Sequence, residues 1–164
     1  MAIPIGTISY AAAAAAFLFL SLLLVTSWRG RLQGVLLAVA SLGTALWAGV
    51  VAYSAARPGS ATLAVAVLEV LRSAVWFAFL MVLLGYSREK LGPLRQAAAG
   101  VAAFCALVLV ATLYTGGGSA AQPVTYSILG RLMMAVVGMV LVEQLYRNVN
   151  PQQRWGIKFL CLGL

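Results

Sequence analysis

Charged residues are scarce in this chain, and two chemically active residue types are missing altogether. Of its 164 residues, 11 are basic and 3 are acidic, and there is no histidine and no aspartate. These absences exclude, within this stretch, a Ser-His-Asp triad, a histidine-based metal site and a phosphoacceptor histidine. The phosphate-binding patterns GxxxxGK[ST] and GxGxxG are absent too. We therefore expect no catalytic residue, no metal and no cofactor in residues 1–164.

Apolar residues take the place of the missing charge. Hydrophobic residues make up 63% of the chain and charged residues 9%, with a mean hydropathy of +1.02, whereas a soluble domain carries roughly 25% charged residues. An apolar stretch of about 20 residues crosses a bilayer as a helix. The pattern predicts an all-α, polytopic transmembrane helical bundle whose partner is the lipid bilayer. Five full spans are expected at about residues 8–28, 32–55, 62–84, 97–114 and 126–146.

The last apolar run predicts that the membrane region continues, and the prolines support the expected gaps between spans. A sixth apolar run covers residues 155–164, about half the length that a membrane crossing needs. We therefore expect residues 1–164 to be the N-terminal transmembrane domain of a longer protein. Proline disrupts a helix interior, and the last four expected gaps contain Pro58, Pro93, Pro123 and Pro151.

The basic residues predict the orientation of the chain in the membrane. Lysine and arginine accumulate in short cytoplasmic loops, and here they gather in or beside the first, third and fifth gaps, at Arg29, Arg31, Arg88, Lys90, Arg95, Arg147, Arg154 and Lys158. The opposite side has only Arg57. The N-terminus is therefore expected outside. The net charge of +8 is a topology signal, and we expect no nucleic-acid partner because no soluble domain presents a basic face.

A small set of polar residues falls inside the expected spans, where charge is costly and each ionisable group is a functional candidate. Glu69 and Arg72 share one helix face, which Ser73 and Trp76 continue. Arg131 lies at a similar depth in the fifth span, about 10 Å from the outer edge at 1.5 Å per residue. Two interpretations remain open. The cluster binds an anionic or polar ligand from the periplasm or outer leaflet, or it is a structural ion pair that fixes helix packing.

Two further patterns have open interpretations. Glu143 and Arg147 form an i,i+4 pair at the inner end of the fifth span, either a plain interfacial pair or a latch that passes motion to the cytoplasm. Ala45 and Gly49 stand four apart in the second span. Such small residues allow close helix approach, either within one chain or between two.

Two stretches resemble a known family. They are GTISYAAAAAAFLFLSLLLVTSWRGRLQG, residues 6–34, and VEQLYRNVNPQQRWGIKFLCLGL, residues 142–164. Both resemble the N-terminal membrane region of the PrsK family of sensor histidine kinases, which belongs to the PEP-CTERM/exosortase system of Gram-negative bacteria. The segments TSWRGRLQG and RWGIKFLCLGL are the most specific. Residues 35–141 are similar in hydropathy and number of spans rather than in particular residues.

The resemblance implies a function for the longer protein. Beyond residue 164 it implies further membrane helix, a GAF-like domain, and phosphoacceptor and kinase domains that use ATP and Mg. It also implies a homodimer in the bacterial inner membrane. Through a response regulator, this two-component system would control genes for exopolysaccharide and exported PEP-CTERM proteins. No catalytic residue of the family falls within residues 1–164, so this region would sense a signal or anchor the kinase.

Two alternatives to a sensor remain. One is a small multi-pass transporter or channel subunit, although the sequence has neither the internal repeat nor the broken helices that many transporters carry. The other is a passive membrane anchor.

Overall fold

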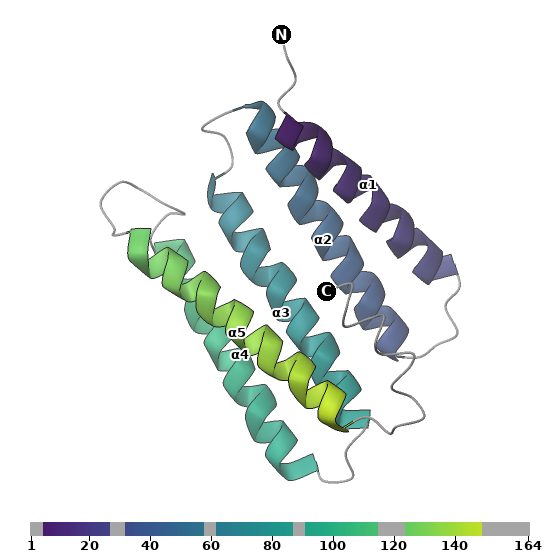
Figure 1. Cartoon of the computed structure of the whole chain (residues 1–164), viewed down its shortest axis with the longest axis vertical. Helices are drawn as coiled ribbons and strands as arrows, with labels where there is room; N and C mark the ends of the chain where they lie inside the picture. The colour runs from purple at the N-terminus through teal and green to yellow at the C-terminus, as the bar shows by residue number, and fades with distance from the viewer. Residues whose placement is uncertain (1–4, 27–31, 58–61, 87–90, 115–123, 149–164) are drawn as a thin grey trace.

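Five helices make up the part of the chain that the structure describes, which comprises residues 5–26, 32–57, 62–86, 91–114 and 124–148. The structure is a computed structural model, and it contains no strand in these residues. The helices are α1 (Ile5–Thr26), α2 (Leu32–Ala56), α3 (Thr62–Tyr86), α4 (Leu91–Tyr114) and α5 (Val124–Asn148) (Figure 1). Each is long and apolar enough to cross a membrane. The prediction of an all-α fold with five helices long and apolar enough to span a membrane is confirmed for the described residues.

The helix bounds differ from the predicted spans mainly at α4. This helix begins at Leu91 rather than at residue 97, so the prediction that Pro93 lies in a gap was wrong. Proline is tolerated in the first turn because backbone N–H groups there have no partner within the helix. The expected sixth span at residues 155–164 lies outside the described residues, and the external position of the N-terminus stays a prediction.

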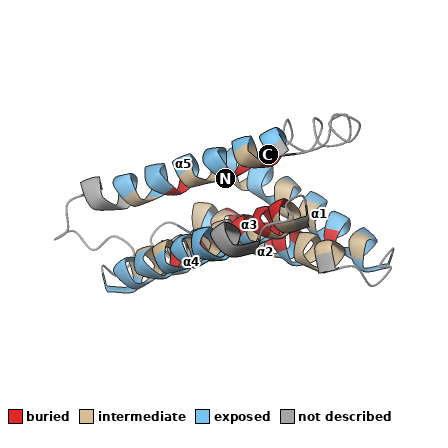
Figure 2. Ribbon diagram, turned by 90° about the horizontal axis from the view of Figure 1, so that it is seen from below, coloured by how far each residue is buried: buried red, intermediate tan, exposed pale blue. Residues whose placement is uncertain are grey.

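The first four helices pack in chain order and α5 lies against one side of them. α1 contacts α2, α2 contacts α3, and α3 contacts α4. α5 contacts α3 and α4, and in the described residues its backbone approaches neither α1 nor α2. Figure 2 shows α5 set off from the layer that the other helices form. This arrangement leaves space between α5 and the first two helices.

Small residues hold α1 and α2 close together. The buried residues of α2 are all small: Ala40, Ser41, Thr44, Ala45, Ala48 and Ala52. Small side chains let helix backbones approach closely in a membrane, and Ser21 Oγ of α1 donates a hydrogen bond of 3.3 Å to the carbonyl oxygen of Ala38. Ala45 is thus buried within the chain, but a Cβ atom added at Gly49 would meet no atom within 4 Å, so the close approach predicted for the pair is not present at Gly49.

A second, bulkier core joins α3, α4 and α5. Its buried members are Val70, Phe77, Leu80, Met81, Cys105, Met134, Leu141 and Leu145. Outside these two contact regions most large apolar side chains are exposed, as expected of helices that face lipid. α3 is the central helix because it contacts α2, α4 and α5, and α5 reaches the rest of the bundle through it and through α4.

Candidate functional site

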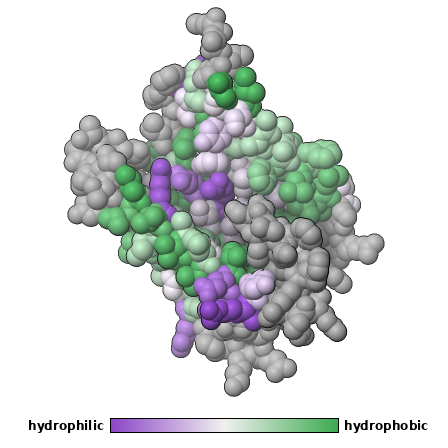
Figure 3. Space-filling model, in the orientation of Figure 1, coloured by the Kyte–Doolittle hydropathy of each residue, from purple (hydrophilic) through white to green (hydrophobic). Residues whose placement is uncertain are grey.

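A groove of about 1070 Å³ lies between α5 and the first three helices. It is at the upper end of the range for small-molecule sites, about 300–1,000 Å³. α1, α2 and α3 line one side, and α5 lines the other. Figure 3 shows hydrophilic surface exposed among the apolar surfaces of the helices. The polar and aromatic residues that line the groove include Ser9, Tyr10, Thr44, Trp47, Glu69, Arg72, Ser73, Trp76, Arg131, Glu143 and Tyr146.

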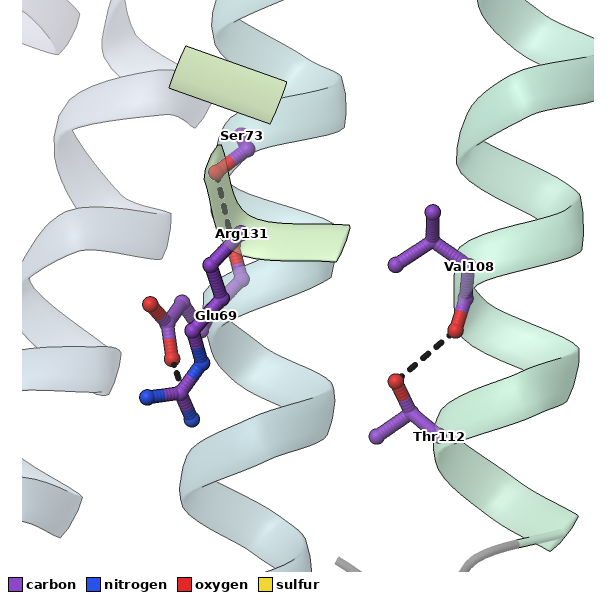
Figure 4. Close-up of polar contacts among 5 residues, drawn as sticks. All are labelled: Glu69, Ser73, Val108, Thr112 and Arg131. Atoms are coloured by element: carbon purple, nitrogen blue, oxygen red, sulfur yellow. Dashed lines mark hydrogen bonds and ion pairs between the residues drawn. The ribbon is translucent and has the colours of Figure 1, made fainter. Parts of the chain in front are cut away.

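An ion pair joins α3 to α5 at one end of this groove. Arg131 Nη2 lies 3.1 Å from Glu69 Oε2, with the arginine side chain 58% exposed and the glutamate 26%. Figure 4 shows the Arg131 side chain reaching from α5 to the carboxylate on α3. The two residues lie at matching depths because α3 and α5 run in the same direction (Figure 1). The sequence-predicted proximity of Glu69 and Arg131 is therefore present as a direct contact.

Arg72 uses a different partner. The centre of its guanidinium group lies 4.1 Å from the centroid of the Trp47 ring on α2, within the range of a cation–π contact. Tyr10 of α1 packs edge-on against the same ring, with centroids 5.9 Å apart. Trp47 therefore connects three helices beside the groove. Glu69 and Arg72 share a face of α3, as expected, but Glu69 pairs with α5 and Arg72 stacks on α2.

Ser73 and Trp76 have structural hydrogen bonds. Ser73 Oγ donates to the carbonyl oxygen of Glu69 at 2.9 Å, within α3 (Figure 4), which is a common local use of a helix serine. Trp76 Nε1 donates to Thr44 Oγ1 at 3.2 Å, and Thr44 Oγ1 donates to the carbonyl oxygen of Ala40 at 2.8 Å. Trp76 thus ties α3 to α2 and forms part of the groove wall.

The charges at this end of the groove do not cancel. Two guanidinium groups, Arg72 and Arg131, face one carboxylate, Glu69. Among the described residues Arg72 has no ion pair; its near neighbour is an aromatic ring. One net positive charge therefore remains at a depth where charge is costly. An anionic group entering the groove would relieve that cost.

The second predicted pair lies at the other end of α5. Arg147 Nη2 is 2.9 Å from Glu143 Oε1, and the side chains are 71% and 57% exposed. Both belong to one helix, so this contact links α5 to no second helix. Arg147 also lies in the last turn, where a positive charge is favourable. The geometry is that of an interfacial pair, and the latch role stays a prediction.

The lining of the groove offers charged, hydroxyl and aromatic side chains. No group of three or more His, Cys, Asp or Glu residues that could hold a metal ion occurs in the residues that the structure describes. The site also contains members that the charged stripe did not reveal, namely Trp47, Tyr10 and Thr44. Trp47 could have been identified from the sequence, because a tryptophan in the middle of a span is expected to pack between helices. Tyr10 joins the site through the packing of α1 on α2, and Thr44 joins it through its hydrogen bond with Trp76 of α3.

Comparison of the chain with protein-family models, with curated proteins and with solved structures finds no match.

Proposed function

We propose that this chain is the membrane sensing region of a two-component sensor histidine kinase. An anionic or polar signal would bind in the groove, change the packing of α5, and pass that change to a kinase domain in the cytoplasm. The observation that carries the sensing role is the Glu69–Arg131 ion pair, which bridges α3 and α5 at the end of the groove where Arg72 and Arg131 outnumber the one carboxylate. The kinase output rests on the resemblance of residues 6–34 and 142–164 to the PrsK family.

The ion pair supplies a physical means of coupling. A ligand shifts a conformational equilibrium only if it prefers one of the two states. An anion that binds Arg131 competes with the Glu69 carboxylate for the same guanidinium group. Binding would therefore weaken the contact that holds α5 to α3, while the apolar core around Phe77 keeps the helices associated. The ligand would favour the state in which α5 is released at this end.

The proposed orientation follows the distribution of lysine and arginine. The N-terminus is outside, and the Arg131 end of the groove lies in the outer half of the bacterial inner membrane. Further membrane helix beyond residue 164, giving an odd number of spans, would bring the kinase domain to the cytoplasm, where ATP and a response regulator are present. The proposed assembly is a homodimer, and the proposed targets are genes for exopolysaccharide and PEP-CTERM protein export.

The first experiment reads the coding frame past the codon for Leu164 and assays the complete gene product. We expect the frame to encode a phosphoacceptor histidine and an ATP-binding domain. A stop codon soon after one more span, with no soluble domain, would contradict the kinase output and favour a transporter or channel subunit.

The sensing role is then tested by charge reversal in the complete protein. Arg131→Glu should change ATP-dependent histidine phosphorylation in membranes, because it replaces the α3–α5 attraction by repulsion. Arg95→Glu, the same reversal at an exposed site on α4, which does not line the groove, should leave phosphorylation unchanged. Membrane insertion and thermal stability of both variants are measured alongside. Unaltered phosphorylation in a well-folded Arg131→Glu protein would favour a passive anchor.

A further inference from the structure

The groove has charged residues at both ends and an apolar middle. On α5 the lining residues between Arg131 and Glu143 are apolar, and they include Met134, Gly138 and Met139. At 1.5 Å per residue the 12 residues from Arg131 to Glu143 cover about 18 Å. The hydrocarbon of one leaflet is about 15 Å thick, half of a 30 Å core. The apolar part is therefore long enough for an acyl chain that enters from the Arg131 end.

The groove also opens sideways. Met139 lines it and is 74% exposed, so a molecule in the surrounding lipid has lateral access. Gly138 lets α5 lie close to α3, because a Cβ atom at this position would lie only 3.3 Å from Cε1 of Phe77. Both residues line the groove, so its middle is a contact between the two helices. A groove that follows α5 in this way suits a linear apolar chain rather than a compact soluble molecule.

The Arg131 end of the groove suits an anionic headgroup. Arg72 and Arg131 lie about one-third of the way along their helices, and arginine side chains reach toward the headgroup region from such depths. Arg72 has no carboxylate partner among the described residues, and Arg131 can exchange Glu69 for a phosphate, with which guanidinium forms strong bidentate contacts. The net charge of this end selects an anionic over a zwitterionic lipid.

We propose that the groove binds an anionic phospholipid, with its phosphate on Arg72 and Arg131 and an acyl chain along α5 past Gly138. This inference rests on the proposed function, because it names the class of ligand for the same groove. It commits to a lipid of the membrane itself rather than to a soluble anion. A second copy of the chain, or a segment of this chain outside the described residues, is the competing occupant that the test must distinguish.

Tryptophan quenching by brominated lipids tests the proposal in the complete protein. Trp28→Phe and Trp155→Phe, with any tryptophan beyond residue 164 also replaced by phenylalanine, leave Trp47 and Trp76, which both line the groove, as reporters. The protein is placed in nanodiscs that contain brominated phosphatidylglycerol or brominated phosphatidylcholine at the same low mole fraction. We expect phosphatidylglycerol to quench at least twofold more strongly. Inorganic phosphate in the buffer should not change the ratio of quenching by phosphatidylglycerol to quenching by phosphatidylcholine.

Three variants locate the site. The double variant Arg72→Gln/Arg131→Gln should bring the ratio to one. Ala135→Leu, at an exposed position that lines the groove, should lower quenching by narrowing the chain path while keeping both charges. Arg95→Gln, an arginine replacement on α4, which does not line the groove, should keep the full ratio. Circular dichroism checks the helical content of each variant.

Several results would overturn the lipid assignment. These are equal quenching by both lipids, or the same preference for phosphatidylglycerol in the double arginine variant as in the unaltered protein. Loss of this preference when inorganic phosphate is added would indicate a site for a free anion. Absence of quenching by either lipid would show that protein fills the groove. Because quenching reports binding alone, a lipid preference with unaltered kinase output would refute the sensor and keep the lipid site. Altered output in Arg131→Glu without a lipid preference would refute only the lipid.

Discussion

Replacing Glu69 by Gln, Arg131 by Gln, and both together isolates the free energy with which their ion pair holds α5 to α3. At the observed 3.1 Å the Coulomb attraction is about 1 kcal/mol in water and about 5 kcal/mol at an effective dielectric constant of 20. The Arg131 side chain is more than half exposed, which places the pair toward the lower value. We expect a coupling energy of about 1–2.5 kcal/mol, between that of surface pairs and that of buried ones.

The Glu143–Arg147 pair provides a matched control. Its N–O distance of 2.9 Å is slightly shorter than that of the Glu69–Arg131 pair. Both of its residues belong to α5, however, and each side chain is more exposed than its counterpart in the Glu69–Arg131 pair. Such i,i+4 pairs contribute about 0.2–0.5 kcal/mol. Both cycles are measured by reversible unfolding of the chain in mixed micelles, followed by circular dichroism. Equal coupling in the two cycles, or a Glu69–Arg131 coupling below about 0.5 kcal/mol, would refute the bridging role.

Two further substitutions test the packing that surrounds the groove. Phe77→Ala removes a buried ring from the core that joins α3, α4 and α5 and should lower the free energy of unfolding by about 3 kcal/mol. Leu71→Ala, at a site 44% exposed, should lower it by less than about 1 kcal/mol. Equal losses in the two variants would show that the core is misplaced. Thr44→Val removes the acceptor of the Trp76 hydrogen bond and should cost about 0.6 kcal/mol, the average for such bonds between membrane helices. Thr26→Val, whose hydroxyl bonds to carbonyl groups of its own helix, should cost less, and the reverse order in the same unfolding assay would contradict the interhelical bond.

The sequence allowed the helices and the depth of the charged residues to be predicted. Long apolar runs set the span bounds to within a few residues, because a bilayer demands a minimum apolar length. The main error was the start of α4, where Pro93 was assigned to a gap although a first turn accepts proline. The meeting of Glu69 with Arg131 was also predictable, since residues at equal depth in helices of the same direction can approach one another.

The partners of the other groove residues could not be predicted. That Arg72 stacks on Trp47 depends on how α2 turns its faces toward α3, and the nearly uniform apolar surface of α2 does not encode this. Ser73 lies on the predicted polar face, but its hydroxyl bonds within α3. The groove itself arises because, in the part of the chain that the structure describes, the backbone of α5 approaches neither α1 nor α2, a tertiary property that hydropathy does not record.

The central claim is that α5 moves relative to α2 when an anion displaces the Glu69 carboxylate from Arg131. Pulsed electron paramagnetic resonance measures this directly, with spin labels at Leu46 on α2 and Val140 on α5, two exposed positions, in a complete protein whose cysteines have been replaced. The account predicts that the distance distribution differs between nanodiscs of phosphatidylglycerol and of phosphatidylcholine, and that Arg131→Gln removes the difference. A distribution that is the same in both lipids would contradict it.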